Sequence, residues 1–395
     1  MAFTANERNT LALTAVGHFG VHFAMLVFPT AAIVIARAEG LALETVIGWS
    51  FAGYLIFGLG ALPVGLLTDH LRARWVVRAS VLGIGPALMA VAWAEPGASM
   101  AAALAVVGLF ASLYHPPGLG LISRTITARG TALGINGVFG NLGIAMAPAL
   151  TEAAAAVWGW RGAYLSLGLA LGALGLAVAF LPITEPPLVA DQGGQRAWSN
   201  RKRLLLFAVL MSAMTLGGLS YRAATVAQPA YFAERINLMG YGAATSLVYM
   251  LGTLGQFLAG RMADRHDLRL LYFGFHAISL PLVLSMAFLH QSALLAAASA
   301  FIFFSIGMQP VENSLVARFT PERWRSTGYG LKFSVVFGVG ALSVRAVEAF
   351  ILNYSLAHVF MGVAVVVAGI VTIAGLLAWL TRGRPITNPG AQGSL

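Results

Sequence analysis

The sequence predicts an all-α membrane protein with twelve transmembrane helices in two pseudo-symmetric six-helix bundles. Composition, the spacing of long apolar stretches and an internal repeat predict this fold. Of the 395 residues, 58% are hydrophobic and only 10% are charged, and the mean hydropathy is +0.81. Soluble domains carry about a quarter charged residues. The composition therefore indicates a chain that crosses a membrane repeatedly.

Twelve apolar stretches are separated by charged residues, Pro and Gly. A helix of about 20 residues crosses the ~30 Å hydrocarbon layer of a bilayer. The first stretch is too long for a signal-peptide core and lacks a small-residue cleavage site, so we expect it to be retained. The predicted transmembrane helices lie near residues 11–36, 45–67, 76–94, 100–123, 130–157, 162–181, 204–233, 241–260, 270–289, 293–317, 327–351 and 356–380.

A short charged motif occurs twice and indicates two homologous halves. Gly65-Leu-Leu-Thr-Asp69 returns as Gly260-Arg-Met-Ala-Asp264, each position 195 residues later and each copy followed by basic residues. Each copy ends one apolar stretch and precedes the next. Duplicated halves are typical of transporters. The predicted units are a first bundle (1–181), a cytoplasmic linker (182–203), a second bundle (204–381) and a cytoplasmic tail (382–395).

The net charge of +10 is explained by the orientation of the chain in the membrane rather than by a surface that binds nucleic acid. Most of the 24 Lys and Arg residues fall in the tails and alternate loops, which places both termini in the cytoplasm by the positive-inside rule. The chain has no Cys, so disulfides and thiolate metal sites are excluded. No nucleophile, phosphate-loop or acidic metal motif occurs, so we expect neither an enzyme nor a cofactor. We expect a bacterial inner-membrane protein that contacts lipids and no nucleic acid.

Polar residues inside the apolar stretches predict a central binding site. The repeat pairs His22 with Arg222, His115 with Gln309, and Asn136 with Lys332. An ionisable group at mid-membrane costs roughly 2.5–3.5 kcal/mol on insertion scales, so it normally faces a cavity or a partner. The predicted substrate-binding residues are His22, Tyr54, His115, Asn136, Arg222, Tyr249, Gln256, Gln309 and Lys332.

The loop after residue 64 carries the motif of a known family. Gly65, Asp69, His70 and Arg74 match a Gly-x-x-x-Asp-basic pattern, and with the twelve-helix duplication the chain resembles the major facilitator superfamily. It departs from the usual pattern at Arg72 and Ala73. The resemblance implies a monomer whose two bundles rock around a central site. It also implies that Asp69, and by the repeat Asp264, help to latch the inward-closed state, with Arg74 and Arg265 in the same gating set.

Three further segments resemble the fosmidomycin-resistance-like group of that superfamily. They are Gly17-His18-Phe19 with Pro29 downstream, Tyr114-His115-Pro116-x-Gly118, and Gly140-Asn141-Leu142-Gly143. Two departures weaken a drug-antiporter interpretation. His22 stands where that group often has an acid, and Ala147-Pro148-Ala149 replaces the antiporter Gly-Pro-x-x-Gly-Gly.

The charged residues of the second half predict the sign of the substrate. Arg222, Lys332 and Arg345 stand against Glu312 and Glu348, which leaves one positive charge in excess and favours an anion. Arg222 suits bidentate binding of a carboxylate or phosphonate, or it forms an internal ion pair with Glu312. Glu312 and Lys332 could also pair, while Arg345 and Glu348 share a helix face.

The three histidines His18, His22 and His115 allow two interpretations. His18 and His22 share a helix face, so the three could bind a metal. No acid accompanies them, and a hydrogen-bonding or proton-handling role is favoured. We therefore expect a secondary active transporter of a small organic, anionic solute, with protons carried by His22, His115 or Glu312. The alternatives are a proton-driven amphiphile efflux pump, a metal or metal-chelate transporter, and a non-transporting receptor.

Overall fold

The computed structural model describes residues 3–68, 71–186, 200–320, 330–383 and 386. These residues are helical almost throughout and include no β-strand. Ten helical segments among them are long and apolar enough to cross a membrane, and one of these, Thr131–Ala179, is 49 residues long. That segment contains two crossings, because its backbone breaks at Gly159 (φ 67°, ψ 177°). With the helix Tyr241–Ala263, the twelve predicted crossings are present.

The first half runs from residue 5 to residue 179. Its helices are α1 (Ala5–Glu39), α2 (Leu43–Gly48), α3 (Ser50–Leu59), α4 (Ala61–Thr68), α5 (Ala73–Val91), α6 (Ala98–Ser112), α7 (His115–Thr125) and α8 (Arg129–Ala179). The predicted helix 45–67 is divided into α2, α3 and α4. The backbone at Trp49 and Gly60 stays in the right-handed helical region, so the three still form one crossing.

The second half begins at Asn200 and mirrors the first. Its elements are α9 (Asn200–Arg235), α10 (Tyr241–Ala263), α11 (Leu268–Met286), α12 (Gln291–Gly307), α13 (Gln309–Phe319), the π-helical η2 (Ser334–Val339), α15 (Leu342–Asn353) and α16 (Leu356–Leu380). The predicted helix 327–351 begins at residues outside the described range. Its described part, Gly330–Asn353, contains the π-helix η2, which the apolar pattern alone did not predict.

The sequence specifies the ends of α1 closely. Thr4 and Glu7 form a capping box, in which the Glu7 N–H donates to Thr4 Oγ1 at 3.2 Å and the Thr4 N–H donates to Glu7 Oε2 at 2.9 Å. These bonds satisfy backbone donors at the first turn, which have no partner within the helix. Gly40 ends the helix with φ 65°, a conformation that glycine adopts without strain.

The predicted helices 100–123 and 293–317 are both interrupted at equivalent positions. The first breaks between α6 and α7 at Leu113 and Tyr114, just before Pro116. The second breaks between α12 and α13 at Met308, just before Pro310. Proline lacks the amide hydrogen of a helix interior and clashes with the preceding turn, so the repeat places the same break in each half.

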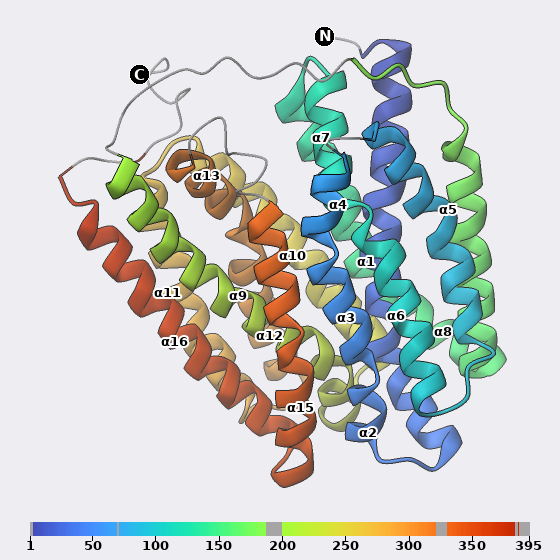
Figure 1. Cartoon of the computed structure of the whole chain (residues 1–395). Coiled ribbons are helices and arrows are strands. Elements are labelled where there is room, and N and C mark those ends of the chain that lie inside the picture. The colour runs from blue at the N-terminus through green and yellow to red at the C-terminus, as the bar shows by residue number, and fades with distance from the viewer. Residues whose placement is uncertain (1–2, 69–70, 187–199, 321–329, 384–385, 387–395) are drawn as a thin grey trace.

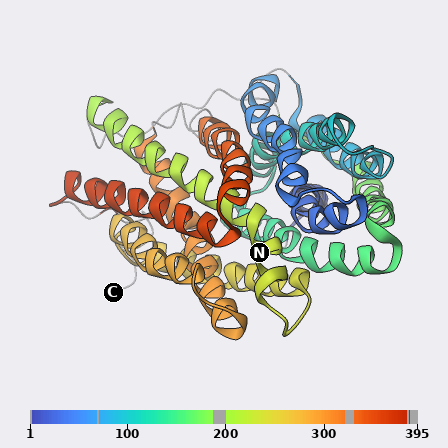
Figure 2. The same ribbon diagram turned by 90° about the horizontal axis from the view of Figure 1, so that it is seen from below.

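The two halves lie side by side, and both termini lie at one end of the molecule (Figure 1). The view from below shows the same division, with the first half in blue to green and the second in lime to red (Figure 2). Helices α8 and α10, α3 and η2, and α2 and α15 contact each other across the division. Helices α2 and α15 lie at the end opposite the termini (Figure 1).

Hydrogen bonds join the halves at that opposite end. The amides of Gly242 and Ala243 donate to Glu152 Oε2 at 3.0 and 3.3 Å, and the Ala149 amide donates to Ser246 Oγ at 2.9 Å. Gly58 approaches Gly338 so closely that a Cβ at Gly58 would lie 2.0 Å from the Gly338 nitrogen. The halves are therefore tightly packed where α3 meets η2.

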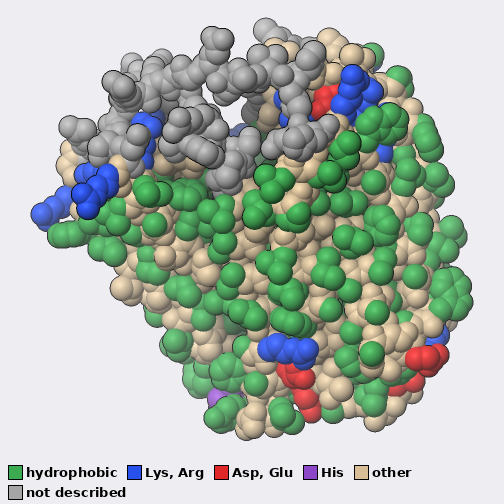
Figure 3. Space-filling model, viewed as in Figure 1, with side chains coloured by type: hydrophobic (Ala, Val, Ile, Leu, Met, Phe, Trp, Pro, Cys, Tyr) green, Lys and Arg blue, Asp and Glu red, His purple; other side chains and the backbone are tan. Residues whose placement is uncertain are grey.

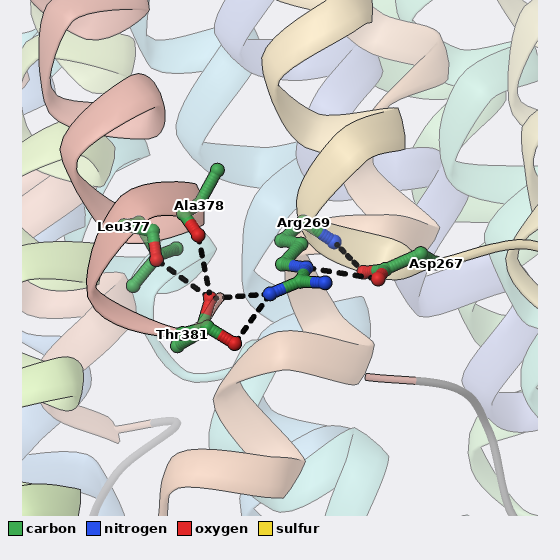
Figure 4. Close-up of polar contacts among 5 residues, drawn as sticks. All are labelled: Asp267, Arg269, Leu377, Ala378 and Thr381. Atoms are coloured by element: carbon green, nitrogen blue, oxygen red, sulfur yellow. Dashed lines mark hydrogen bonds and ion pairs between the residues drawn. The ribbon is translucent and has the colours of Figure 1, made fainter. Parts of the chain in front are cut away.

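The last helix of each half is tied to the third crossing of the same half. Arg269 at the start of α11 donates to the carbonyl of Thr381, which follows α16, and also pairs with Asp267 at 2.8 Å (Figure 4). In the first half, Arg74 at the start of α5 donates to the carbonyl of Ile183, which follows α8. The predicted repeat is therefore reproduced in the anchoring contacts of its two copies.

The surface agrees with membrane burial. Apolar side chains cover the middle of the face in Figure 3, and charged side chains gather toward its two ends. Side chains such as Leu66, Leu169 and Val365 are 60%, 64% and 74% exposed to the surroundings of the protein. An aqueous surface would make that exposure costly, whereas a lipid surface accommodates it.

Candidate functional site

The three histidines of the predicted site come together in the structure. His18 and His22 lie one turn apart on α1, and His115 is the first residue of α7. Their nearest ligand-capable nitrogens all lie within 4.8 Å of one another. The ring centroids of His115 are 5.4 Å from His18 and 5.2 Å from His22. We refer to these three side chains as the histidine cluster.

The orientation of His18 is fixed by α8 and by the break in the fourth crossing. Its Nδ1 lies 2.8 Å from the Asn136 carbonyl oxygen. Because a carbonyl only accepts, Nδ1 carries the hydrogen and Nε2 holds a lone pair. Nε2 lies 3.1 Å from His22 Nε2. The Tyr114 ring stacks on His18 with centroids 5.2 Å apart, so the imidazole is held on two sides.

Asn136, a predicted substrate-binding residue, contacts two residues around the cluster, and its role in substrate binding stays a prediction. Its side-chain Nδ2 donates to the Tyr114 hydroxyl at 2.7 Å, and that hydroxyl donates to the Thr14 carbonyl at 2.7 Å. The side chain is 1% exposed. Asn136 therefore fixes His18 directly through its carbonyl and indirectly through the Tyr114 ring, while its Oδ1 has no hydrogen-bond partner among the described residues.

Arg222 of α9 lies against the first half. It is 2% exposed, its Cζ lies 3.6 Å from the centroid of the Tyr54 ring, and it is close enough to His22 for an electrostatic interaction. The Tyr54 hydroxyl donates to the Met25 carbonyl at 2.8 Å, which fixes the ring. Within the described part of the chain, Arg222 Nε and Nη1 have no hydrogen-bond partner.

The ion pair proposed between Arg222 and Glu312 is absent from the described residues, and that interpretation was wrong. Glu312 instead pairs with Lys332 at 2.7 Å, and both side chains are nearly inaccessible. Lys332 also donates to Asn313 Oδ1 at 2.6 Å. This pair joins α13 to the residues just before η2. The alternative pairing of Glu312 with Lys332 is confirmed.

The ion pairs among the charged residues of the second half account for every predicted central charge except that of Arg222. Arg345 Nη1 lies 2.7 Å from Glu348 Oε2, as the spacing on one helix face predicted. With Lys332 and Glu312 also paired, the excess positive charge of the second half falls on Arg222. The predicted charge excess is thereby located at a single side chain beside the histidine cluster.

Two of the remaining predicted residues, Gln256 and Gln309, form a separate amide group with Asn141, which was not among the predicted substrate-binding residues. Asn141 Nδ2 of α8 donates to Gln256 Oε1 of α10 at 2.5 Å, and Gln256 Nε2 donates to Gln309 Oε1 of α13 at 2.8 Å. Tyr249 is buried on α10, and its hydroxyl has no partner among the described residues. Asn141 and Gln256 therefore link the halves, and Gln309 holds Gln256 within the second half. The Tyr249 hydroxyl stays available.

Three phenylalanines complete the site and were not predicted. The ring centroids of Phe57, Phe333 and Phe337 lie 5.6, 5.0 and 5.4 Å from that of His115. Phe57 lies three residues after Tyr54 on α3, and Phe333 and Phe337 lie four apart. Helical spacing from the predicted site residue Tyr54 could have indicated Phe57, but nothing in the sequence places the other two beside it.

The predicted gating residues are only partly described. Asp69 lies outside the described residues. Arg74 contacts the segment after α8 in its own half. Asp264 is the C-cap of α10 and Arg265 lies in the following turn. Their role in gating stays a prediction.

A polar centre shared by two six-helix halves is the architecture of a membrane transporter that works by alternating access. The sequence agrees with this class: residues 14–344 match the family model of the Major Facilitator Superfamily. The chain belongs to the Major Facilitator Superfamily, a family of membrane transporters.

Comparisons with solved structures support the fold. Two structures of a bacterial homolog of the human lysosomal transporter Spinster, both inward-facing, superpose with a TM-score of 0.71. The unoccupied form is 12% identical and the occupied form 14% identical, and each match covers 96% of this chain and 97% of the other. A search of curated proteins gave no significant match.

Proposed function

We propose that this protein is a proton-coupled transporter of a small organic anion. The observation that carries the proposal is the isolated charge of Arg222. This guanidinium is 2% exposed and two of its nitrogens lack partners among the described residues. A buried charge without a partner is costly. An anionic substrate would supply the missing negative charge.

The surroundings of Arg222 suit a substrate that contacts both halves. Arg222 belongs to the second half and stacks on Tyr54 of the first, beside His22. A guanidinium presents a planar fork of donors that binds a carboxylate or phosphonate through two hydrogen bonds. An anion held there would contact elements that separate when the halves rock. Its affinity would then differ between the two states, as alternating access requires.

The pair of Glu312 and Lys332 is the proposed site of proton coupling. Protonation of Glu312 would remove the negative charge that holds Lys332 at 2.7 Å and free Lys332 to turn toward the substrate. His22 and His115 were the other candidates from the sequence. Glu312 is preferred because its protonation alters a buried ion pair, which is a large local change in charge.

The topology follows the same proposal. Both termini would be cytoplasmic in a bacterial inner membrane, and the protein would function as a monomer. The hydrogen bonds at the end opposite the termini would then close the periplasmic side. Under this assignment, the structure represents an inward-facing state. Opening to the periplasm would require those bonds and the contact of Gly58 with Gly338 to separate.

Proton flux into proteoliposomes that contain a pH dye would test the anion assignment. The protein would be challenged with carboxylates, phosphonates and lipophilic cations. We expect a response to an anion that is lost in Arg222→Gln and retained in Arg345→Gln, because Arg345 is a half-exposed arginine of the same half with its own partner. A response to lipophilic cations that survives Arg222→Gln would refute the proposal and indicate amphiphile efflux.

A second variant would test the coupling. Glu312→Gln keeps the shape of the side chain but cannot release a proton. We expect it to exchange labelled anion across the membrane while failing to accumulate it against a gradient. Accumulation at the level of the unsubstituted protein would exclude Glu312 as the proton carrier and leave the anion assignment intact.

A further inference from the structure

We infer that the histidine cluster binds a transition-metal ion, and that the transported anion enters as the chelate of that ion. The inference rests on the proposed function and names its substrate class. The anion would be a carboxylate chelator that holds the metal with some coordination positions left open. The three imidazoles would fill those positions while Arg222 holds a carboxylate of the chelator.

The geometry of the cluster suits a metal. Metal–nitrogen bonds of ~2.0–2.1 Å place two ligand nitrogens about 3.3 Å apart in a tetrahedral site. His18 Nε2 and His22 Nε2 are already 3.1 Å apart, and all three ligand nitrogens lie within 4.8 Å. Small rotations of the rings would therefore be sufficient. Imidazole is a preferred ligand of zinc, copper and nickel ions.

The hydrogen bonds of His18 are those of a preorganised metal ligand. Metal-binding histidines usually donate their second ring N–H to a carbonyl or carboxylate, which fixes the tautomer and the direction of the lone pair. His18 Nδ1–H donates to the Asn136 carbonyl at 2.8 Å, so the Nε2 lone pair points toward His22. The Tyr114 ring, held by Asn136 and Thr14, prevents the imidazole from turning away.

The charges around the cluster favour a chelate over a bare ion. Among the described residues, the group that could hold a metal contains three histidines and no carboxylate. Arg222 acts electrostatically on His22, and none of the ion pairs among the described residues includes Arg222. A bare dication would add positive charge beside Arg222. A chelate with carboxylates reduces or reverses that charge and gives the two free donors of Arg222 an acceptor.

The aromatic wall supports the same substrate class. Phe57, Phe333 and Phe337 surround His115 with centroids 5.0–5.6 Å away. An apolar wall lowers the local dielectric and strengthens electrostatic interactions within the site. It would also limit replacement of the imidazole ligands by water. The metal, the carboxylate and the carbon skeleton of a chelate would thus each face a matching part of the site.

Visible absorption of Co²⁺ would test the site directly. The full-length protein would be purified in detergent with an affinity tag that contains no histidine. It would be titrated with Co²⁺ alone, with equimolar Co²⁺ and citrate, and with citrate alone, the last by calorimetry. We expect imidazole coordination to change the Co²⁺ spectrum, and Co²⁺ with citrate to bind more tightly than either component.

The variants separate the two parts of the inference. His22→Gln removes a ligand and should weaken Co²⁺ binding by more than ~10–100-fold, which is the usual loss for removing only a supporting contact. His115→Gln should act similarly and provides a second variant if the first folds poorly. Arg222→Gln should weaken binding of Co²⁺ with citrate but not of Co²⁺ alone. His276→Gln, a buried histidine of α11 outside the cluster, is the matched control.

Three outcomes would contradict the inference in whole or in part. If excess Co²⁺ gives the unsubstituted protein no spectral change that depends on the cluster, the metal site does not exist. If Co²⁺ alone binds as tightly as Co²⁺ with citrate and Arg222→Gln does not weaken either, the chelate assignment is wrong. If an anion binds through Arg222 with no effect of metal or of the cluster variants, this inference fails while the proposed function stands.

Discussion

Replacement of Gly58 by Ala should shift the protein toward the state that is open at the end opposite the termini. In the structure, a Cβ at Gly58 would lie 2.0 Å from the Gly338 nitrogen and 2.4 Å from its Cα. Ordinary contact needs 3.4–4 Å, so α3 and η2 would have to separate by about 1.4–2 Å. Both neighbours are backbone atoms and cannot turn aside.

Overpacking of this kind costs roughly 1–3 kcal/mol. Because α3 and η2 belong to different halves, the cost applies to the state in which they touch and is relieved when they separate. A differential of this size shifts a conformational equilibrium by about 5–150-fold. The effect should therefore appear as a change in population rather than as a loss of folding.

The absence of Cys from the chain makes a labelling assay free of background. Ser246→Cys replaces a nearly buried serine that accepts a hydrogen bond from the Ala149 amide between the halves. We expect its reaction rate with a membrane-impermeant maleimide to rise about 5–150-fold when Gly58→Ala is added. Gly134→Ala is the control, since nothing lies within 4 Å of a Cβ there. Equal rates for Gly58→Ala and Gly134→Ala would refute the reasoning.

Three further predictions concern stability and binding. Lys332→Met should leave Glu312 buried without its partner and cost ~3–5 kcal/mol of stability. We expect a lower unfolding temperature in detergent, which the added change Glu312→Gln partly restores; equal stability of the single and double variants would contradict this. Glu185→Gln should cost about 1.5–3 kcal/mol, because its carboxylate accepts from two α5 amides and from Arg124 at 2.7 Å; unchanged thermal unfolding would show that this network adds no stability. Tyr249→Phe should change stability by less than ~0.5 kcal/mol, since the hydroxyl has no partner among the described residues. The same variant should raise the KM for the anion, and an unchanged KM would place that hydroxyl outside the site.

The sequence determined the membrane class, the crossings and the duplication. Hydropathy is a local property, because about 20 apolar residues in succession suffice for a helix to span the bilayer. The repeat of Gly65 and Asp69 as Gly260 and Asp264 could likewise be read directly from the sequence. The breaks before Pro116 and Pro310 follow from the missing amide hydrogen of proline. The family model over residues 14–344 confirms the resemblance drawn from these features.

Only the tertiary structure decided which charges pair and which face the centre. Sequence analysis left Glu312 with two possible partners, and the structure selects Lys332 at 2.7 Å, which leaves Arg222 alone against Tyr54. The tautomer of His18 follows from the Asn136 carbonyl of a helix 118 residues away. These contacts depend on how each helix is rotated and tilted against helices distant in the sequence. Packing of side chains sets that arrangement, and hydropathy does not encode it.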